Sequence, residues 1–234
     1  MGRRDIYNRT GWTYAEDRYG APQMQEYLRA RNEALVALVR RLPGEGSKVL
    51  DVGCGTGLSL RALQFPGQNA RLFGVDFSHT MAVQTREALG ASVARLSLAD
   101  ARHLPFPDGT FDMVYSTRFI HQFADKKPVF DELRRVTKPD GLVVVEFYER
   151  LFHSLRYWWS GPRASKDEFL SHFPSRAEVR HVVGKPFERV PLRLPGAKML
   201  LPVIGAKGVQ RLTELVGGGP LSVFVDEYFV AVRK

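Results

Sequence analysis

Three glycines at alternate positions constrain the possible folds of this chain more than any other feature. A short run ending in Val49 and Leu50 leads into Asp51, glycines occupy positions 53, 55 and 57, and leucines at 58, 60 and 63 recur with helical spacing. This order predicts a strand, a tight turn and the start of a helix, because glycine adopts positive φ at little cost. A ligand can approach such a turn closely, so we expect a binding site there.

The spacing excludes two common glycine loops. A P-loop needs lysine and then serine or threonine after its last glycine, whereas Leu58 and Ser59 follow Gly57 here. The dinucleotide pattern G-x-G-x-x-G needs a glycine at 58 or 60, where the chain has leucines. What remains is D-x-G-x-G-x-G, in which Asp51 disfavours a pyrophosphate and favours an ammonium or sulfonium group. A turn with only a structural role is the alternative.

Four further segments extend this pattern in order: residues 74–78, 98–101, 110–116 and 133–145. Together with residues 49–57 they resemble the successive motifs of the class I S-adenosylmethionine-dependent methyltransferases. The similarity is greatest to the subgroup that includes ubiquinone and menaquinone biosynthesis methyltransferases, and it covers about residues 45–147. Asp140 departs from the family pattern, which usually has glycine at that position.

The order of strands and helices predicts an α/β fold. We expect strands at 48–52, 71–75, 92–99, 111–116, 142–147, 187–194 and 222–232, alternating over the first part of the chain with helical segments. Further helices are expected at 22–42, after a Ser175–Glu178 capping box, and, bent, at 197–216. The resemblance implies a Rossmann-like, seven-stranded, mostly parallel sheet with helices on both faces and an antiparallel last strand. We predict one domain over 1–234, with a helical cap at 1–47, a cofactor-binding core at 48–147 and acceptor-side elements at 148–234.

The resemblance implies S-adenosyl-L-methionine as cofactor and S-adenosyl-L-homocysteine as product. The cofactor contacts expected from it are Asp51, Gly53, Cys54, Gly55, Gly57, Asp76, Phe77, Met81, Asp100, Ala101, Ser116, Tyr19 and Arg31. In the family the acidic residue at position 76 accepts hydrogen bonds from the ribose hydroxyls, and Phe77 would pack on the adenine. Asp100 would accept from the adenine amino group, beside the backbone N–H of Ala101. The alternative for each aspartate is a helix N-cap, and NAD enzymes also place an acidic residue at the spacing of Asp76.

Related enzymes fold their N-terminal helices over the cofactor, which is why Tyr19 and Arg31, and also Tyr14, are candidates for the site. A structural role for these three is the alternative.

Methyl transfer is an in-line displacement that relies mainly on proximity and alignment. An oxygen or carbon acceptor also requires a general base. His121, five residues after Ser116, lies in the segment that borders the acceptor in related enzymes, and histidine titrates near neutrality. Arg118 stands where an apolar residue is expected, so it is a candidate for holding an anionic group of the acceptor. The alternatives are a structural histidine and a solvent-facing arginine.

The formal net charge of +9 is concentrated in the flanks, because residues 51–150 contain twelve basic and twelve acidic side chains. Residues 150–163 interleave aromatic rings with basic residues. Together with the basic flanks, they suit an acidic or hydrophobic small acceptor, RNA or a membrane surface. A solvated surface with some of the rings in the core is the simplest interpretation. We therefore predict a methyltransferase of a small molecule acting at oxygen or carbon. An RNA methyltransferase and a non-catalytic binding module are the alternatives.

The cysteine and histidine content argues against a disulfide-stabilised or metal-binding protein. One cysteine allows no disulfide framework, and six scattered histidines without cysteine partners make a metal site unexpected. The N-terminus lacks the apolar core of a signal peptide, and no apolar run reaches the length of a membrane span. A cytoplasmic protein without a transmembrane segment is the expectation.

Overall fold

The computed structural model describes residues 8, 22–65, 67, 69–90, 94–148, 172, 174–184, 186–193, 208, 211–212 and 227–234. The chain divides into two compact units, which are described separately. The first comprises Met1–Thr117, Pro128–Val144 and Arg233–Lys234, and the second comprises Arg118–Lys127 and Val145–Val232. The expectation of one domain over 1–234 stays a prediction.

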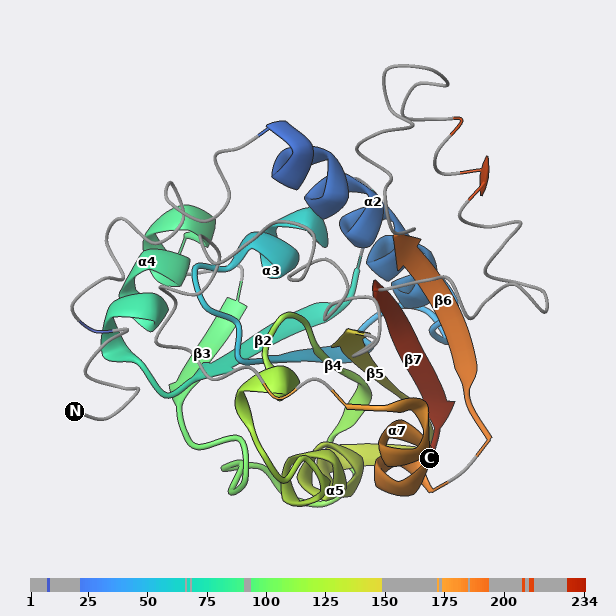
Figure 1. The fold of residues 1–234 in the computed structure, drawn as a ribbon. Coiled ribbons are helices and arrows are strands. Elements are labelled where there is room, and N and C mark those ends of the chain that lie inside the picture. The colour runs from blue at the N-terminus through green and yellow to red at the C-terminus, as the bar shows by residue number, and fades with distance from the viewer. Residues whose placement is uncertain are drawn as a thin grey trace. The chain divides into compact units, whose positions relative to one another are not determined.

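The described residues form a seven-stranded sheet with the order β3-β2-β1-β4-β5-β7-β6 (Figure 1). β1 is parallel to β2 and β4, β2 is parallel to β3, and β6 and β7 pair antiparallel. This confirms the predicted Rossmann-like sheet and its antiparallel last strand. The strands are β1 (Lys48–Val52), β2 (Arg71–Asp76), β3 (Ala94–Leu98), β4 (Phe111–Ser116), β5 (Thr137–Tyr148), β6 (Glu188–Arg193) and β7 (Glu227–Arg233).

Helices cover both faces of the sheet in the first unit. The helices α2 (Pro22–Val39), α3 (Leu58–Ala62) and α4 (His79–Leu89) lie on one face, and α5 (Lys127–Val136) lies on the other (Figure 1). Val49, Leu50 and Met113 are fully buried, as expected for parallel strands covered on both sides. None of the helices in the described ranges is long and apolar enough to cross a membrane.

β5 begins at Thr137, five residues before the predicted start, because the segment around Asp140 that reads as a turn belongs to the strand. Asp140 has φ 60°, in the left-handed region that aspartate tolerates better than most residues. Aspartate can therefore occupy position 140, where the family usually has glycine. Gly141 is the crowded position instead, since a Cβ there would lie 2.7 Å from Thr137 Cγ2.

In the second unit, a short 3-10 helix (η1, Ile120–Gln122) precedes α7 (Arg176–Val183), which starts at the predicted capping box of Ser175 and Glu178. The Arg189 guanidinium packs over the Tyr228 ring at 4.1 Å. The helix predicted at 197–216 lies outside the described residues except for positions 208, 211 and 212. The whole aromatic and basic stretch at 150–163 also lies outside them.

Arg135 joins α5 to the segment before β4. Its guanidinium donates to the carbonyl oxygens of Leu104 and Phe106 and forms ion pairs with Glu132 and Asp108 at 2.7 Å. We expect Arg135→Ala to lower the free energy of unfolding by about 2 kcal/mol, because hydrogen bonds from a charged donor are lost. Arg134→Ala in the same helix turn is the matched control, with an expected change below about 0.5 kcal/mol. Equal urea midpoints for the two variants would contradict this role.

Candidate functional site

The glycine loop is tied to the end of β2 through backbone hydrogen bonds. Gly53, Gly55 and Gly57 have φ of 78°, 56° and 77°, which confirms the predicted need for glycine in this turn. The N–H groups of Gly53 and Cys54 both donate to Val75 O, at 2.8 and 3.0 Å. The loop is therefore held as a rigid turn at the carboxyl ends of β1 and β2.

Asp76 connects this loop to α4. Its Oδ2 accepts from the Gly55 N–H and its Oδ1 accepts from the Ser78 N–H, both at 2.9 Å. Ser78, and not Asp76, is the N-cap of α4. Burial raises the pKa of Asp76, although the hydrogen bonds from Ser78, Gly55 and Phe77 lower it. Each carboxylate oxygen keeps a lone pair with which it can accept a further hydrogen bond.

Asp51 is a buried carboxylate just before the glycine loop. Its side chain is 1% exposed, and its oxygens accept no hydrogen bond from the residues that the structure describes. Burial raises the pKa of Asp51 to about 7, opposed by the Tyr115 hydroxyl and the Arg31 charge and assisted by Asp76. Tyr115 acts as a polar neighbour whose geometry falls short of a full hydrogen bond. Such a carboxylate is suited to a ligand that brings a positive charge.

Arg31 reaches the same region from α2. It is 2% exposed, and its Nη2 donates to Ser59 Oγ at 3.0 Å, while Ser59 Oγ and Thr117 Oγ1 share a hydrogen bond of 3.0 Å. The Nε atom is buried and makes no hydrogen bond within the described ranges. A buried acid and a buried guanidinium thus lie at one loop, an arrangement complementary to a zwitterion.

The sequence did not single out Tyr115, Ser59 or Thr117. The signal for Tyr115 is its position in β4 directly opposite Asp51 in β1, which becomes visible only with the strand register. Ser59 and Thr117 carry no motif of their own, and they become part of the site because Arg31 folds onto them.

The other predicted cofactor residues around the loop are mostly buried. Met81 is 2% exposed in the first turn of α4, Phe77 is half-buried, and burial raises the pKa of the Cys54 thiol. The Ser116 hydroxyl donates to Val52 O at 2.9 Å and so links β4 to β1. Their contacts with a cofactor stay predictions.

Asp100 lies after β3 and pairs with Arg102. Arg102 Nη2 lies 2.6 Å from Asp100 Oδ2, and this arginine lowers the pKa of the Asp100 carboxyl. The pair is exposed, whereas Ala101 beside it is buried. A ligand group that binds Asp100 must therefore share the carboxylate with Arg102.

The two predicted catalytic residues belong to the second unit. Arg118 has φ 52°, and its N–H donates to Glu146 Oε2 at 3.1 Å. The His121 ring meets the Tyr148 ring edge to face, with centroids 5.3 Å apart. Tyr14 and Tyr19 lie outside the described residues, so their predicted contacts are not placed.

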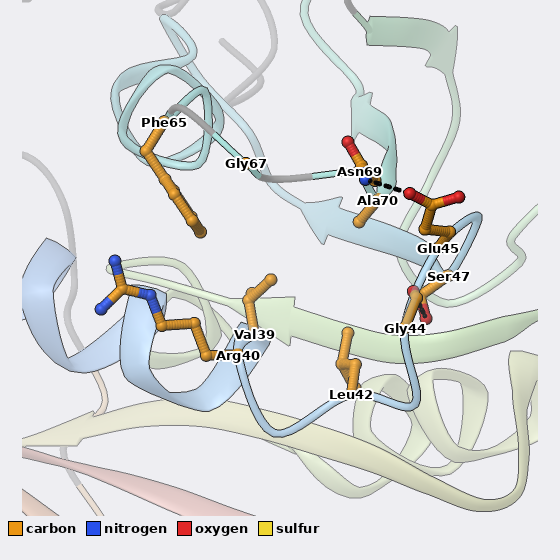
Figure 2. Close-up of a pocket in the computed structure, with 10 residues that line it drawn as sticks. All are labelled: Val39, Arg40, Leu42, Gly44, Glu45, Ser47, Phe65, Gly67, Asn69 and Ala70. Atoms are coloured by element: carbon orange, nitrogen blue, oxygen red, sulfur yellow. Dashed lines mark hydrogen bonds between the residues drawn. The ribbon is translucent and has the colours of Figure 1, made fainter.

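A pocket of about 250 Å³ lies at the amino ends of β1 and β2, away from the glycine loop (Figure 2). Val39, Leu42 and Phe65 give it an apolar lining, and the Arg40 guanidinium lies 5.0 Å from the Phe65 ring centroid. Ligands of open parallel sheets bind at the carboxyl ends instead, so the glycine loop is the candidate site. Within the described ranges, no three metal-ligating side chains gather into a group.

Comparisons with known proteins relate this chain to methyltransferases. Residues 50–145 match a family model described as a methyltransferase domain. The chain is 35% identical over 178 residues to the malonyl-[acyl-carrier protein] O-methyltransferase of Geobacter sulfurreducens, covering 71% of this chain and 66% of that protein. It is 39% identical over 124 residues to the demethylmenaquinone methyltransferase of Thermus thermophilus, covering 51% and 54%. The matches thus span less than two thirds of either relative.

A solved structure shares the fold over the full chain. The phosphoethanolamine N-methyltransferase 2 of Haemonchus contortus in complex with S-adenosyl-L-methionine superposes with a TM-score of 0.66. The match covers 100% of this chain and 60% of that one, at 18% sequence identity. Identity at this level shows a common fold and no more.

Proposed function

Because the chain belongs to the class I S-adenosylmethionine-dependent methyltransferases, we propose that it methylates a small acidic or hydrophobic molecule at oxygen or carbon. S-Adenosyl-L-methionine is the cofactor of this family, and when bound it supplies a methyl group already activated on a sulfonium. The observation that carries the proposal is the buried Asp51 carboxylate beside the glycine loop, without a hydrogen bond from the described residues.

The residues at the loop fit the amino acid end of this cofactor. Asp51 is suited to the ammonium group, and the buried Arg31 guanidinium is suited to the carboxylate. Among the residues that the structure describes, no atom lies within 4 Å of a Cβ built on Gly55, so a ligand can approach this Cα closely. The Asp51 carboxylate, the Arg31 guanidinium and the accessible Gly55 backbone thus all suit one zwitterionic ligand.

Asp76 and Asp100 are proposed to hold the adenosine. Asp76 already orders the loop through Gly55 and retains the lone pairs to accept from two ribose hydroxyls. Asp100 would accept from the adenine amino group, with the backbone N–H of Ala101 beside it. Phe77, half-buried next to Asp76, would pack on the adenine ring.

Substitutions at two glycines separate ligand binding from folding. Gly57→Ala is expected to destabilise the protein by about 3 kcal/mol, because its φ is 77° and the new Cβ would lie 2.9 Å from Thr85 Cγ2. Gly55→Ala meets no neighbour in the described part of the chain and should cost about 1 kcal/mol. It should nevertheless weaken S-adenosylmethionine binding more than tenfold per folded molecule. Urea unfolding and equilibrium titration measure the two effects. Unchanged affinity in Gly55→Ala would place the cofactor elsewhere.

In the acceptor reaction, His121 is proposed to remove a proton from the acceptor, and Arg118 to hold an anionic group. A positioned base of this kind contributes about 10²- to 10⁴-fold to a rate. The relatives' names mention a malonyl group on acyl-carrier protein and demethylmenaquinone, which favours such acceptors over RNA. The cytoplasmic location also remains part of the proposal.

The test is transfer of labelled methyl from S-adenosylmethionine into a cell lysate that is then separated into organic extract, small polar molecules, RNA and protein. Label in the organic or small-molecule fraction, or on an acyl group carried by acyl-carrier protein in the protein fraction, is the expected result. Nuclease-sensitive label would favour the RNA alternative, and its salt dependence would then report phosphate contacts. Cofactor binding without label in any fraction would favour a non-catalytic module.

A further inference from the structure

Glu146 is a buried carboxylate near the end of β5 that no predicted motif contains. Its side chain is fully buried in the second unit, where an ionised acid requires hydrogen-bond donors. The Arg118 N–H donates to Oε2 at 3.1 Å, and the Tyr148 hydroxyl donates to Oε1 at 2.8 Å. The two carboxylate oxygens of Glu146 thus bind two different segments of the second unit, at Arg118 and at Tyr148.

The first contact holds the start of the segment that leads to His121. Arg118 has φ 52°, a left-handed conformation that is unfavourable for a non-glycine residue. A hydrogen bond from its N–H to a buried carboxylate can offset this cost. Glu146 therefore stabilises the left-handed backbone conformation of Arg118.

The second contact holds His121 itself. Tyr148 lies two residues beyond Glu146, on the same face of β5. The hydroxyl bond fixes the Tyr148 ring, which meets the His121 ring edge to face, with an interplanar angle of 81° and centroids 5.3 Å apart. The carbonyl oxygen of His121 also accepts from the His172 N–H at 2.7 Å. Both the backbone and the ring of His121 are thereby fixed.

We infer that Glu146 is a positioning residue that holds His121 in its reactive orientation, through the Arg118 backbone on one side and the Tyr148 ring on the other. This inference rests on the proposed role of His121 as the base. It assigns Glu146 no contact with the acceptor. A displacement of about 1 Å at a reacting group lowers a rate on the order of 100-fold, so the two contacts matter for turnover and not for cofactor affinity.

The test uses the full chain and two readouts, the ¹⁵N ring signals of His121 and the initial rate of labelling of the lysate fraction that the wild-type enzyme labels. Tyr148→Phe keeps the ring and removes its bond to Glu146. We expect altered His121 signals and a rate about tenfold lower, with S-adenosylmethionine affinity within about twofold of wild type. Glu146→Gln should retain the wild-type values, because its amide can accept from Arg118 and donate to Tyr148. Tyr228→Phe, at another buried tyrosine of the unit, is the matched control.

Unchanged His121 signals in Tyr148→Phe would overturn the inference. Loss of affinity for S-adenosylmethionine in parallel with the rate would also overturn it, because the effect would then be a general loss of structure. His121→Gln separates the two proposals. If that variant keeps the wild-type rate while Tyr148→Phe still moves the His121 signals, the base role fails and the positioning of the ring stands.

Discussion

Asp76→Ala is expected to weaken S-adenosylmethionine binding by a factor of about 100 or more. The substitution removes the proposed acceptor of two ribose hydroxyl hydrogen bonds, and bonds to a charged partner contribute about 1.5–3 kcal/mol each. It also removes the acceptor of the Gly55 and Ser78 N–H groups, which order the loop and the first turn of α4. Equilibrium titration with the cofactor measures the loss.

Asp112→Asn is the matched control for Asp76→Ala. Asp112 is another strand carboxylate, less buried than Asp76, that accepts a backbone N–H, from Lys48 at 2.8 Å, and it pairs with Lys138 at 2.8 Å. It lies at the start of β4, at the amino end of the sheet. Its substitution should lower stability and leave affinity within about twofold. If Asp76→Ala also stays within about threefold of wild type, the proposed ribose site is wrong.

The parts of the fold that depend on local sequence could be predicted closely. β1 and β4 have the predicted bounds, because their apolar runs end at polar or turn-forming neighbours. The capping box at Ser175 was equally visible, since its two partners are three residues apart. β5 was predicted too short because proline, aspartate and glycine at 139–141 are typical turn residues, and only pairing within the sheet draws them into a strand.

The candidate site was predicted less completely, because its chemistry comes from contacts between distant segments. Asp51 and the three glycines belong to one motif, so their proximity follows from the sequence. Burial raises the pKa of Asp51 most, and two neighbours from other segments oppose this rise. Arg31 was expected at the site only through the family resemblance, and Tyr115 reads as one more apolar strand residue. The sequence also did not indicate the role of Glu146. Its two hydrogen-bond partners, the Arg118 N–H and the Tyr148 hydroxyl, become visible only in the folded structure.

The raised pKa of Asp51 predicts that cofactor binding is linked to proton release. In the unliganded folded protein the pKa of Asp51 is about 7 instead of 3.8. Ionisation of Asp51 therefore opposes folding, and the free energy of unfolding falls as the pH rises from 3.8 towards 7. A bound ammonium group favours the ionised form and lowers this pKa. Binding at pH 6 therefore displaces up to one proton, and affinity should rise roughly five- to tenfold between pH 6 and 7.5.

Calorimetric titration with S-adenosylhomocysteine, in buffers that differ in ionisation enthalpy, measures the released proton directly. The product retains the ammonium group and cannot turn over, so the signal is binding alone. Asp51→Asn should abolish both the proton release and the rise in affinity over this pH range, and should bind at least tenfold more weakly at pH 7.5, because the uncharged amide cannot pair with the ammonium. If Asp51→Asn keeps the wild-type proton release, another group titrates on binding, and Asp51 is not the residue that recognises the positive charge.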